Sequence, residues 1–124
     1  MSSFGDRIDT ASFTPISWVA ITMALVSAFV HLYIAVDVLL PSTLGLSFLL
    51  ATGGFVGGVG LVLLNYRRRL VYLLGIPFTG SQIVLWYLLN QPAGVGDIPT
   101  IDFIDKIAQT VLIGCLVALS LREP

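Results

Sequence analysis

Residues 53–60 have the sequence Gly-Gly-Phe-Val-Gly-Gly-Val-Gly and constrain the fold more than any other part of the chain. They lie inside an apolar segment over 43–64 that contains no charged residue. Two GxxxG patterns overlap here, and the glycines expected to pack are Gly53, Gly54, Gly57, Gly58 and Gly60. In lipid no hydrophobic force drives helices together, so close backbone approach over small residues supplies the contact. The stretch therefore predicts a tightly packed transmembrane helix, whose partner lies either within the chain or in a second copy.

The rest of the chain has the composition of a membrane protein. Its 124 residues are 56% hydrophobic and 10% charged, with a mean hydropathy of +0.97, whereas globular domains average roughly 45–50% apolar and 25% charged residues. A transmembrane helix needs about 20 predominantly apolar residues. We therefore expect an all-α, polytopic membrane protein, a single membrane domain over 1–124 folded as a bundle of four transmembrane helices with short loops. The expected spans are approximately 15–40, 43–64, 70–90 and 101–121.

Prolines and capping residues set several of the expected span ends. Thr14 can cap the first span, and Pro15 suits its first turn because the missing N–H has no helical partner there. The same span should stop before Pro41, since proline disfavours helical geometry in the residue that precedes it. Residues 91–99 are rich in proline and glycine and predict the main loop.

The charges and the cysteine content argue against several classes of function. The formal net charge is −1, and the one basic cluster is Arg67, Arg68 and Arg69. No exposed aromatic pattern interleaves with this cluster, so we expect no nucleic-acid partner. The single cysteine rules out an intramolecular disulfide and a CxxC redox centre. Ser27 lies one helical turn from His31 with no acid on the same face, so no catalytic triad is expected. We expect no enzyme activity and no metal site.

The arginines favour one orientation in the membrane. With an even number of spans, placing Arg67, Arg68 and Arg69 in the cytoplasm puts both termini there as well. Arg7 and Arg122 then lie on that side too, and the opposite side is mainly acidic, which satisfies the positive-inside rule. We expect cytoplasmic N- and C-termini and a multi-pass location in the cell (plasma) membrane.

Small and polar residues form stripes along the spans. In the first span they recur at steps of three and four residues, which places them on one helix face: Ser17, Ala20, Ala24, Ser27, His31 and Ala35. The third span carries Thr79, Gln82, Trp86 and Asn90, and the start of the fourth carries Asp102, Asp105 and Gln109. Because polar side chains are costly in hydrocarbon, these faces should point into the bundle.

The depths of these stripes predict that they meet. At a rise of about 1.5 Å per residue, His31, Gln82 and Gln109 fall in a similar layer, slightly outside the membrane midplane. We expect a buried polar cluster of these three residues, with Thr79 below it and the other polar residues toward the outer mouth: Trp86, Asn90, Asp102 and Asp105. Such a cluster either holds the helices in register through hydrogen bonds, or forms a site for a ligand, proton or ion.

Several short motifs resemble a group of small four-helix membrane proteins from halophilic archaea. The resemblance covers nearly the whole chain and rests on His31-Leu32-Tyr33, Asn65-Tyr66-Arg67-Arg68-Arg69, Gly75-Ile76-Pro77-Phe78-Thr79, Gln82 and Trp86-Tyr87. It implies a membrane location in a halophilic archaeon. It implies no activity and no catalytic residue, because the group is uncharacterised.

Three functions fit these observations. The first is a non-enzymatic scaffold or accessory module that contacts membrane lipids and forms a homo-oligomer through the 43–64 helix or joins a larger membrane complex. The second is a transporter or channel-like protein that uses the polar cluster around His31. The third is a binder of haem, a quinone or another lipid-soluble cofactor at His31, although the sequence identifies no cofactor. A bis-histidine haem would need a two-fold dimer, because His31 is the single histidine.

Overall fold

A computed structural model of the protein describes residues 8–39 and 42–122. These residues form four α-helices and no strand: α1 (Pro15–Ile34), α2 (Thr43–Leu63), α3 (Arg68–Asn90) and α4 (Thr100–Arg122). A π-helical turn, η2 (Ala35–Leu39), extends α1, and a short 3-10 helix, η3 (Val95–Asp97), lies in the loop before α4. All four α-helices are long and apolar enough to cross a membrane. The prediction of an all-α protein with four candidate spans is confirmed for the described residues.

The helix ends differ slightly from the expected spans, for local reasons. α1 changes to the wider π-helical geometry after Ile34 instead of continuing as an α-helix. The end expected for the first span, at residue 40, lies outside the described residues. α2 begins after Ser42, whose hydroxyl accepts a hydrogen bond of 3.1 Å from the backbone N–H of Gly45. α3 begins at Arg68, two residues earlier than expected, because Arg67 adopts a left-handed conformation (φ 48°) that reverses the chain within the turn.

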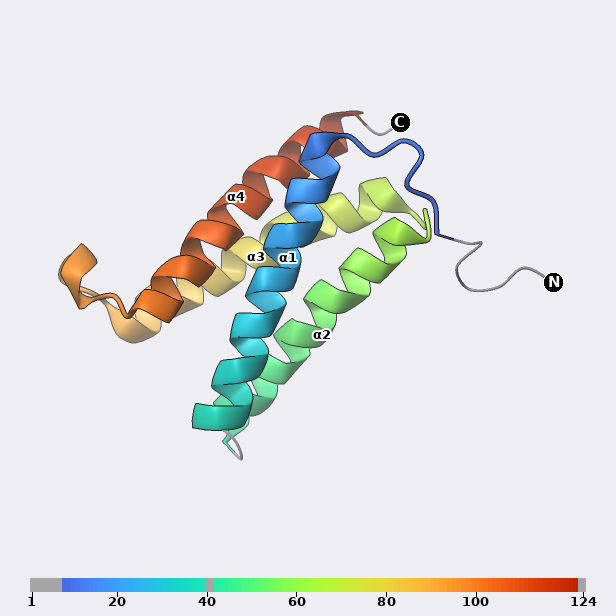
Figure 1. The fold of residues 1–124 in the computed structure, drawn as a ribbon. Coiled ribbons are helices and arrows are strands. Elements are labelled where there is room, and N and C mark those ends of the chain that lie inside the picture. The colour runs from blue at the N-terminus through green and yellow to red at the C-terminus, as the bar shows by residue number, and fades with distance from the viewer. Residues whose placement is uncertain (1–7, 40–41, 123–124) are drawn as a thin grey trace.

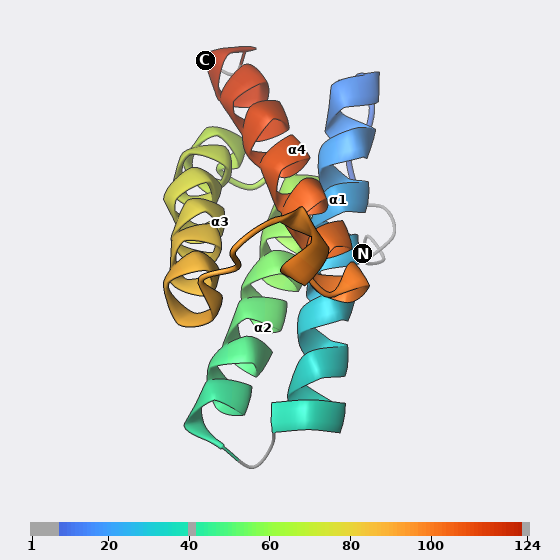
Figure 2. The ribbon, with the colours of Figure 1, turned by 90° about the vertical axis from the view of Figure 1, so that its left-hand side faces the viewer.

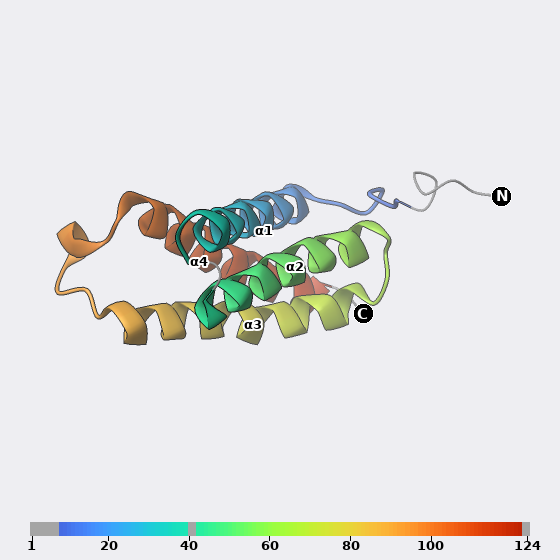
Figure 3. The ribbon, with the colours of Figure 1, turned by 90° about the horizontal axis from the view of Figure 1, so that it is seen from below.

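The helices form two hairpins that cross. α1 packs against both α2 and α4, and α3 packs against α4, whereas α2 and α3 contact each other over only a short stretch. Figure 1 shows the hairpins converging where the α2–α3 turn lies and diverging toward the loop at 91–99. Figure 2 shows α3 and α1 on opposite sides of α4, and Figure 3 shows the 91–99 loop lying well apart from the end of α1. The α2–α3 pair is therefore the most weakly packed seam.

The core is built on the small residues of α1. The whole stripe identified in the first span is buried: Ser17, Ala20, Ala24, Ser27, His31 and Ala35. Because these side chains are small, α1 can approach two neighbouring helices at once. Larger apolar side chains from the other helices close over the stripe: Phe55, Val62, Tyr72, Leu112, Leu116 and Leu119.

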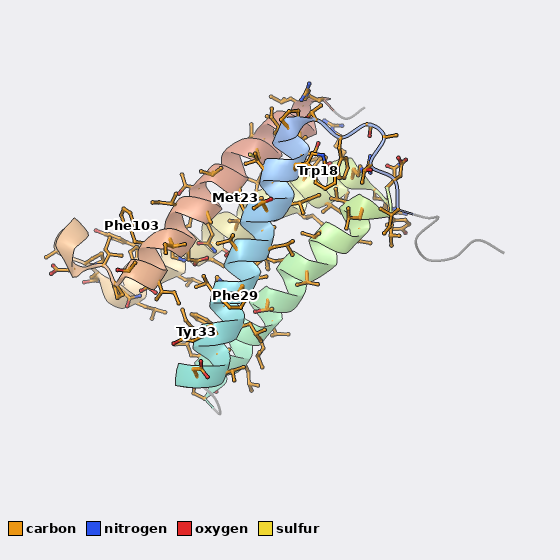
Figure 4. The ribbon with its side chains drawn as sticks, viewed as in Figure 1. Trp18, Met23, Phe29, Tyr33 and Phe103 are labelled. Atoms are coloured by element: carbon orange, nitrogen blue, oxygen red, sulfur yellow. The ribbon has the colours of Figure 1, made fainter. Side chains whose placement is uncertain are left out.

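The outward faces of the helices carry large apolar side chains. Figure 4 shows Trp18, Phe29 and Tyr33 along the outer side of α1, with Phe103 on α4. Phe29 is 70% exposed, and one leucine in each of α2, α3 and α4 is about as open: Leu50, Leu89 and Leu121. Monomeric soluble proteins rarely expose continuous apolar surfaces of this extent. The exposed surface is thus suited to lipid.

The glycines of α2 divide into two groups. A Cβ atom built on Gly54 would lie 2.5 Å from the ring of Phe78, and one on Gly58 would lie 3.8 Å from Val71, so these two glycines face α3. Gly53, Gly57 and Gly60 have nothing within 4 Å of such an atom among the described residues. Only part of the predicted glycine seam is therefore formed within the chain, and Gly53 and Gly57 lie exposed on α2.

Candidate functional site

A buried carboxylate on α4 organises the polar interior. Asp105 is 4% exposed and accepts a hydrogen bond of 2.6 Å from the hydroxyl of Ser27 on α1. Its other oxygen accepts a bond of 3.0 Å from the Lys106 ammonium. The Nδ1 atom of His31 lies 3.9 Å from the carboxylate and 2.8 Å from the Ser27 carbonyl oxygen. Because that carbonyl can only accept, Nδ1 carries the proton and donates to it.

A relay of side chains continues from Lys106 to α3. The Lys106 ammonium donates to Oε1 of Gln109 at 2.8 Å, and Nε2 of Gln109 donates to Oε1 of Gln82 at 2.9 Å. Gln109 is completely buried. The path from His31 through Asp105 and Lys106 to Gln82 therefore connects α1, α4 and α3.

The outer residues of the predicted cluster form a smaller group. The indole N–H of Trp86 donates to Asp102 at 3.1 Å, and the Lys106 ammonium lies 5.6 Å from the centre of the Trp86 ring. That separation falls within the range of a cation–π interaction. Asn90 is exposed and donates to the Trp86 carbonyl oxygen of its own helix, so it lies outside the path.

The structure thus brings most of the predicted site residues together. His31, Gln82, Gln109 and Asp105 lie on one path, and Trp86 and Asp102 join it through Lys106. Sequence reasoning missed the linking roles of Ser27 and Lys106. Ser27 was visible as a member of the His31 stripe, and Lys106 follows Asp105 directly, but a lysine near the end of a span carries no sign that it turns into the bundle.

A cavity of about 410 Å³ lies between α2 and α3, and residues of α1 and α4 also line it. Its walls are almost wholly apolar and include Gly53, Gly54, Gly57 and Gly58 on one side and Gly75, Phe78 and Thr79 on the other. Thr79 is 1% exposed, and its hydroxyl has no hydrogen-bond partner among the residues that the structure describes. His31 is not among the lining residues. It packs beside the rings of Phe48 and Phe55, so the site expected at His31 is separate from this cavity.

Arg68 has a structural role that its place in the basic cluster did not reveal. It is 5% exposed, whereas Arg67 and Arg69 are exposed. Its guanidinium donates to the Val62 carbonyl oxygen at 2.8 Å, to the Ser12 hydroxyl at 2.9 Å and to the carbonyl oxygen of Asp9. It therefore joins the N-terminal segment to the α2–α3 turn.

Hydrogen bonds and an ion pair between Asp105 and Lys106 connect the polar side chains of the bundle interior. Among the described residues, no group of three or more histidine, cysteine, aspartate or glutamate residues is placed to hold a metal ion. The path contains one carboxylate, one ammonium and one histidine in an apolar surrounding. These features define a class of small helical protein whose four apolar helices are suited to crossing a membrane and whose polar side chains meet between them.

The chain belongs to DUF7475, a family of unknown function whose model matches residues 5–120. No curated protein matches the chain, and no solved structure matches it.

Proposed function

We propose that the protein is a multi-pass protein of the cell membrane with the end that carries Arg67, Arg68, Arg69 and Arg122 in the cytoplasm. Both chain ends then lie in the cytoplasm. The positive-inside rule supports this orientation, because the opposite end carries Asp37, Asp97 and Asp102. The motif resemblance supports a source among halophilic archaea.

The orientation predicts a labelling pattern for introduced cysteines. In a Cys115→Ser background, Gly94→Cys in the main loop should react with a membrane-impermeant maleimide in intact cells. Arg69→Cys should react only after the membrane is permeabilised, because it lies at the opposite end of the helices. The reverse pattern, or equal labelling of both variants in intact cells, contradicts the orientation.

We further propose that the protein acts as a non-enzymatic accessory module that assembles through α2. The observation that carries this proposal is the glycine face formed by Gly53, Gly57 and Gly60, where a built Cβ atom would meet nothing within 4 Å among the described residues. Gly53 and Gly57 also border the cavity between α2 and α3. In lipid, such small-residue faces stabilise helix pairs through close backbone contact. The polar path also fits a structural module, because its charged groups have partners and connect three helices.

The partner we propose for this face is a second copy of the chain. A flat glycine face needs a surface with equally small residues opposite it, and the face itself provides one. A two-fold contact places the same patch on both subunits, so no second complementary surface is required. The same packing would extend to a larger membrane complex only if a partner helix had a similar face.

Gly57→Leu is expected to raise the dissociation constant of the dimer in mild detergent by about tenfold or more, equivalent to about 1.4 kcal/mol. The leucine would hold the two backbones apart. Gly114→Leu is the matched control, because Gly114 is an exposed glycine on α4 that also has nothing within 4 Å of a built Cβ. Analytical ultracentrifugation measures both variants. A wild-type protein that is monomeric at all concentrations, or equal dimer fractions in the two variants, would contradict the proposal.

A further inference from the structure

The three consecutive arginines between α2 and α3 have different surroundings. Arg68 is buried, and all three nitrogens of its guanidinium donate hydrogen bonds within the chain. Arg67 and Arg69 are exposed, and neither side chain has a hydrogen-bond partner among the residues that the structure describes. The turn therefore contains one arginine that stabilises the fold and two whose charges remain available to a ligand.

No carboxylate neutralises the two exposed arginines within the described part of the chain. Both ion pairs found there belong to Asp105, which lies in the interior of the bundle. Asp9 is the one described acidic residue at the arginine end, and its carboxylate accepts hydrogen bonds from the backbone N–H of Ala11 and the side chain of Asn65. Four arginines and one aspartate give the described residues of this end a net charge of +3.

The turn is too short to carry these guanidinium groups far from a bilayer. α2 ends at Leu63 and α3 begins at Arg68, so only four residues connect two apolar helices. When both helices cross a membrane, the connecting backbone lies at the depth of the lipid headgroups. Anionic phospholipids carry an uncompensated phosphate at that depth, and they attract basic segments that adjoin a membrane span.

The surroundings of Arg67 leave its hydrogen-bond donors open. Its φ of 48° is uncommon for a residue other than glycine, and its guanidinium lies 5.6 Å from the centre of the Tyr66 ring. A cation–π contact of this kind forms no hydrogen bond to oxygen, so the N–H groups of the guanidinium remain unused. A guanidinium can donate two parallel hydrogen bonds to one phosphate, which an ammonium cannot do.

We propose that Arg67 and Arg69 bind the headgroup phosphate of an anionic phospholipid in the leaflet at the arginine end of the bundle. The positive charge of this end favours an anionic headgroup over a zwitterionic one, whose own cation would be repelled. The proposal rests on the proposed membrane location and names a ligand for arginines that the positive-inside rule assigns only to a side. It is independent of the assembly through α2, because both arginines lie outside the glycine face.

Native mass spectrometry of the full chain in a neutral detergent tests the choice of ligand. The protein is mixed with equal amounts of phosphatidylglycerol and phosphatidylcholine that carry identical acyl chains. Their headgroups differ in mass, so the spectrum identifies each bound molecule, and a bound phosphate ion is recognised in the same way. The wild type should prefer phosphatidylglycerol by about fivefold or more, the factor expected for one basic residue beside a membrane.

Two outcomes of this measurement overturn the proposal. Equal occupancy by the two lipids would show that the turn does not select an anionic headgroup. Displacement of phosphatidylglycerol by inorganic phosphate would show that the arginines bind any phosphate and not a lipid. Because the measurement is made in detergent, its failure is distinct from failure of the proposed orientation, which the maleimide labelling tests.

The arginine pair is tested by Arg67→Gln combined with Arg69→Gln. This double variant should lower the preference for phosphatidylglycerol by about threefold or more, because it removes both charges. Arg122→Gln is the matched control and should keep the wild-type preference, since Arg122 is exposed at the same end but belongs to α4 and donates to the Thr14 hydroxyl.

SDS titration in lipid-free detergent separates binding from folding in these variants. The substituted side chains are exposed, so all variants should unfold at the SDS concentration of the wild type. An unchanged lipid preference in the double variant, or an equal loss of preference in Arg122→Gln, overturns the assignment to Arg67 and Arg69.

Discussion

Asp105→Ala is expected to lower the free energy of unfolding by about 3–5 kcal/mol, since removing one partner of a buried ion pair leaves an uncompensated charge. The ammonium of Lys106 would lose its carboxylate, and the Ser27 hydroxyl would lose its acceptor on α4. That second bond is one of the contacts that join α1 to α4. SDS titration of the detergent-solubilised protein, followed by circular dichroism, measures the change.

Two further variants show whether the loss comes from the buried pair. Asp97→Ala is the matched control, because Asp97 is exposed in η3, and it should change the free energy of unfolding by less than about 0.5 kcal/mol. Adding Lys106→Met to Asp105→Ala removes the stranded charge and should restore part of the lost stability. If Asp105→Ala unfolds at the same SDS concentration as Asp97→Ala, the role assigned to the carboxylate is wrong.

Arg68→Ala should cost about 3 kcal/mol of stability, because it removes a buried guanidinium and the three hydrogen bonds that this group donates. The Asp9 carbonyl oxygen would lose its Arg68 donor, whereas the Val62 carbonyl oxygen would keep the backbone N–H of Asn65 at 3.1 Å. The N-terminal segment should also become accessible, since Arg68 contacts it through Ser12 and through the ring of Phe13. SDS titration measures the first effect, and limited proteolysis near the N-terminus measures the second.

Substitution of the neighbouring Arg69 is the matched control for Arg68→Ala. Arg69 is exposed, lies in the same turn of α3 and has the same charge. Arg69→Ala should therefore leave both stability and proteolysis close to wild type. Equal effects of the two substitutions would mean that Arg68 acts only through its charge at this end of the bundle.

Helical periodicity predicted most of the residues that face inward on α1 and its π-helical extension, although Ala28 and Val30 are buried as well. The steps from Ser17 to Ala35 placed six small and polar residues on one face, and all six are buried. The rise per residue also placed Gln82 and Gln109 at one depth, where their amides are 2.9 Å apart. Both results depend on geometry within a single helix, which the amino-acid order determines directly.

The pairing of helices could not be obtained in the same way. The glycines of α2 predicted a tight seam, but a GxxxG pattern does not specify which helix packs against it. In the structure α2 packs mainly against α1, and a Cβ atom built on Gly53 or Gly57 would meet nothing within 4 Å among the described residues. The role of Lys106 depends on how far its flexible chain reaches between helices. Arg68 is buried only because the N-terminal segment folds back over it. These features arise from tertiary arrangement and have no local signature.

The sparse contact between α2 and α3 has a consequence for biogenesis. Each hairpin, α1 with α2 and α3 with α4, has its own extensive internal packing, and the two are joined mainly where α1 meets α4. With the proposed membrane location, newly made hairpins can enter the bilayer one after the other and associate afterwards, as two-stage folding of membrane proteins describes. Because Ser27 and Asp105 lie on different hairpins, their hydrogen bond can form only once synthesis has delivered the fourth helix.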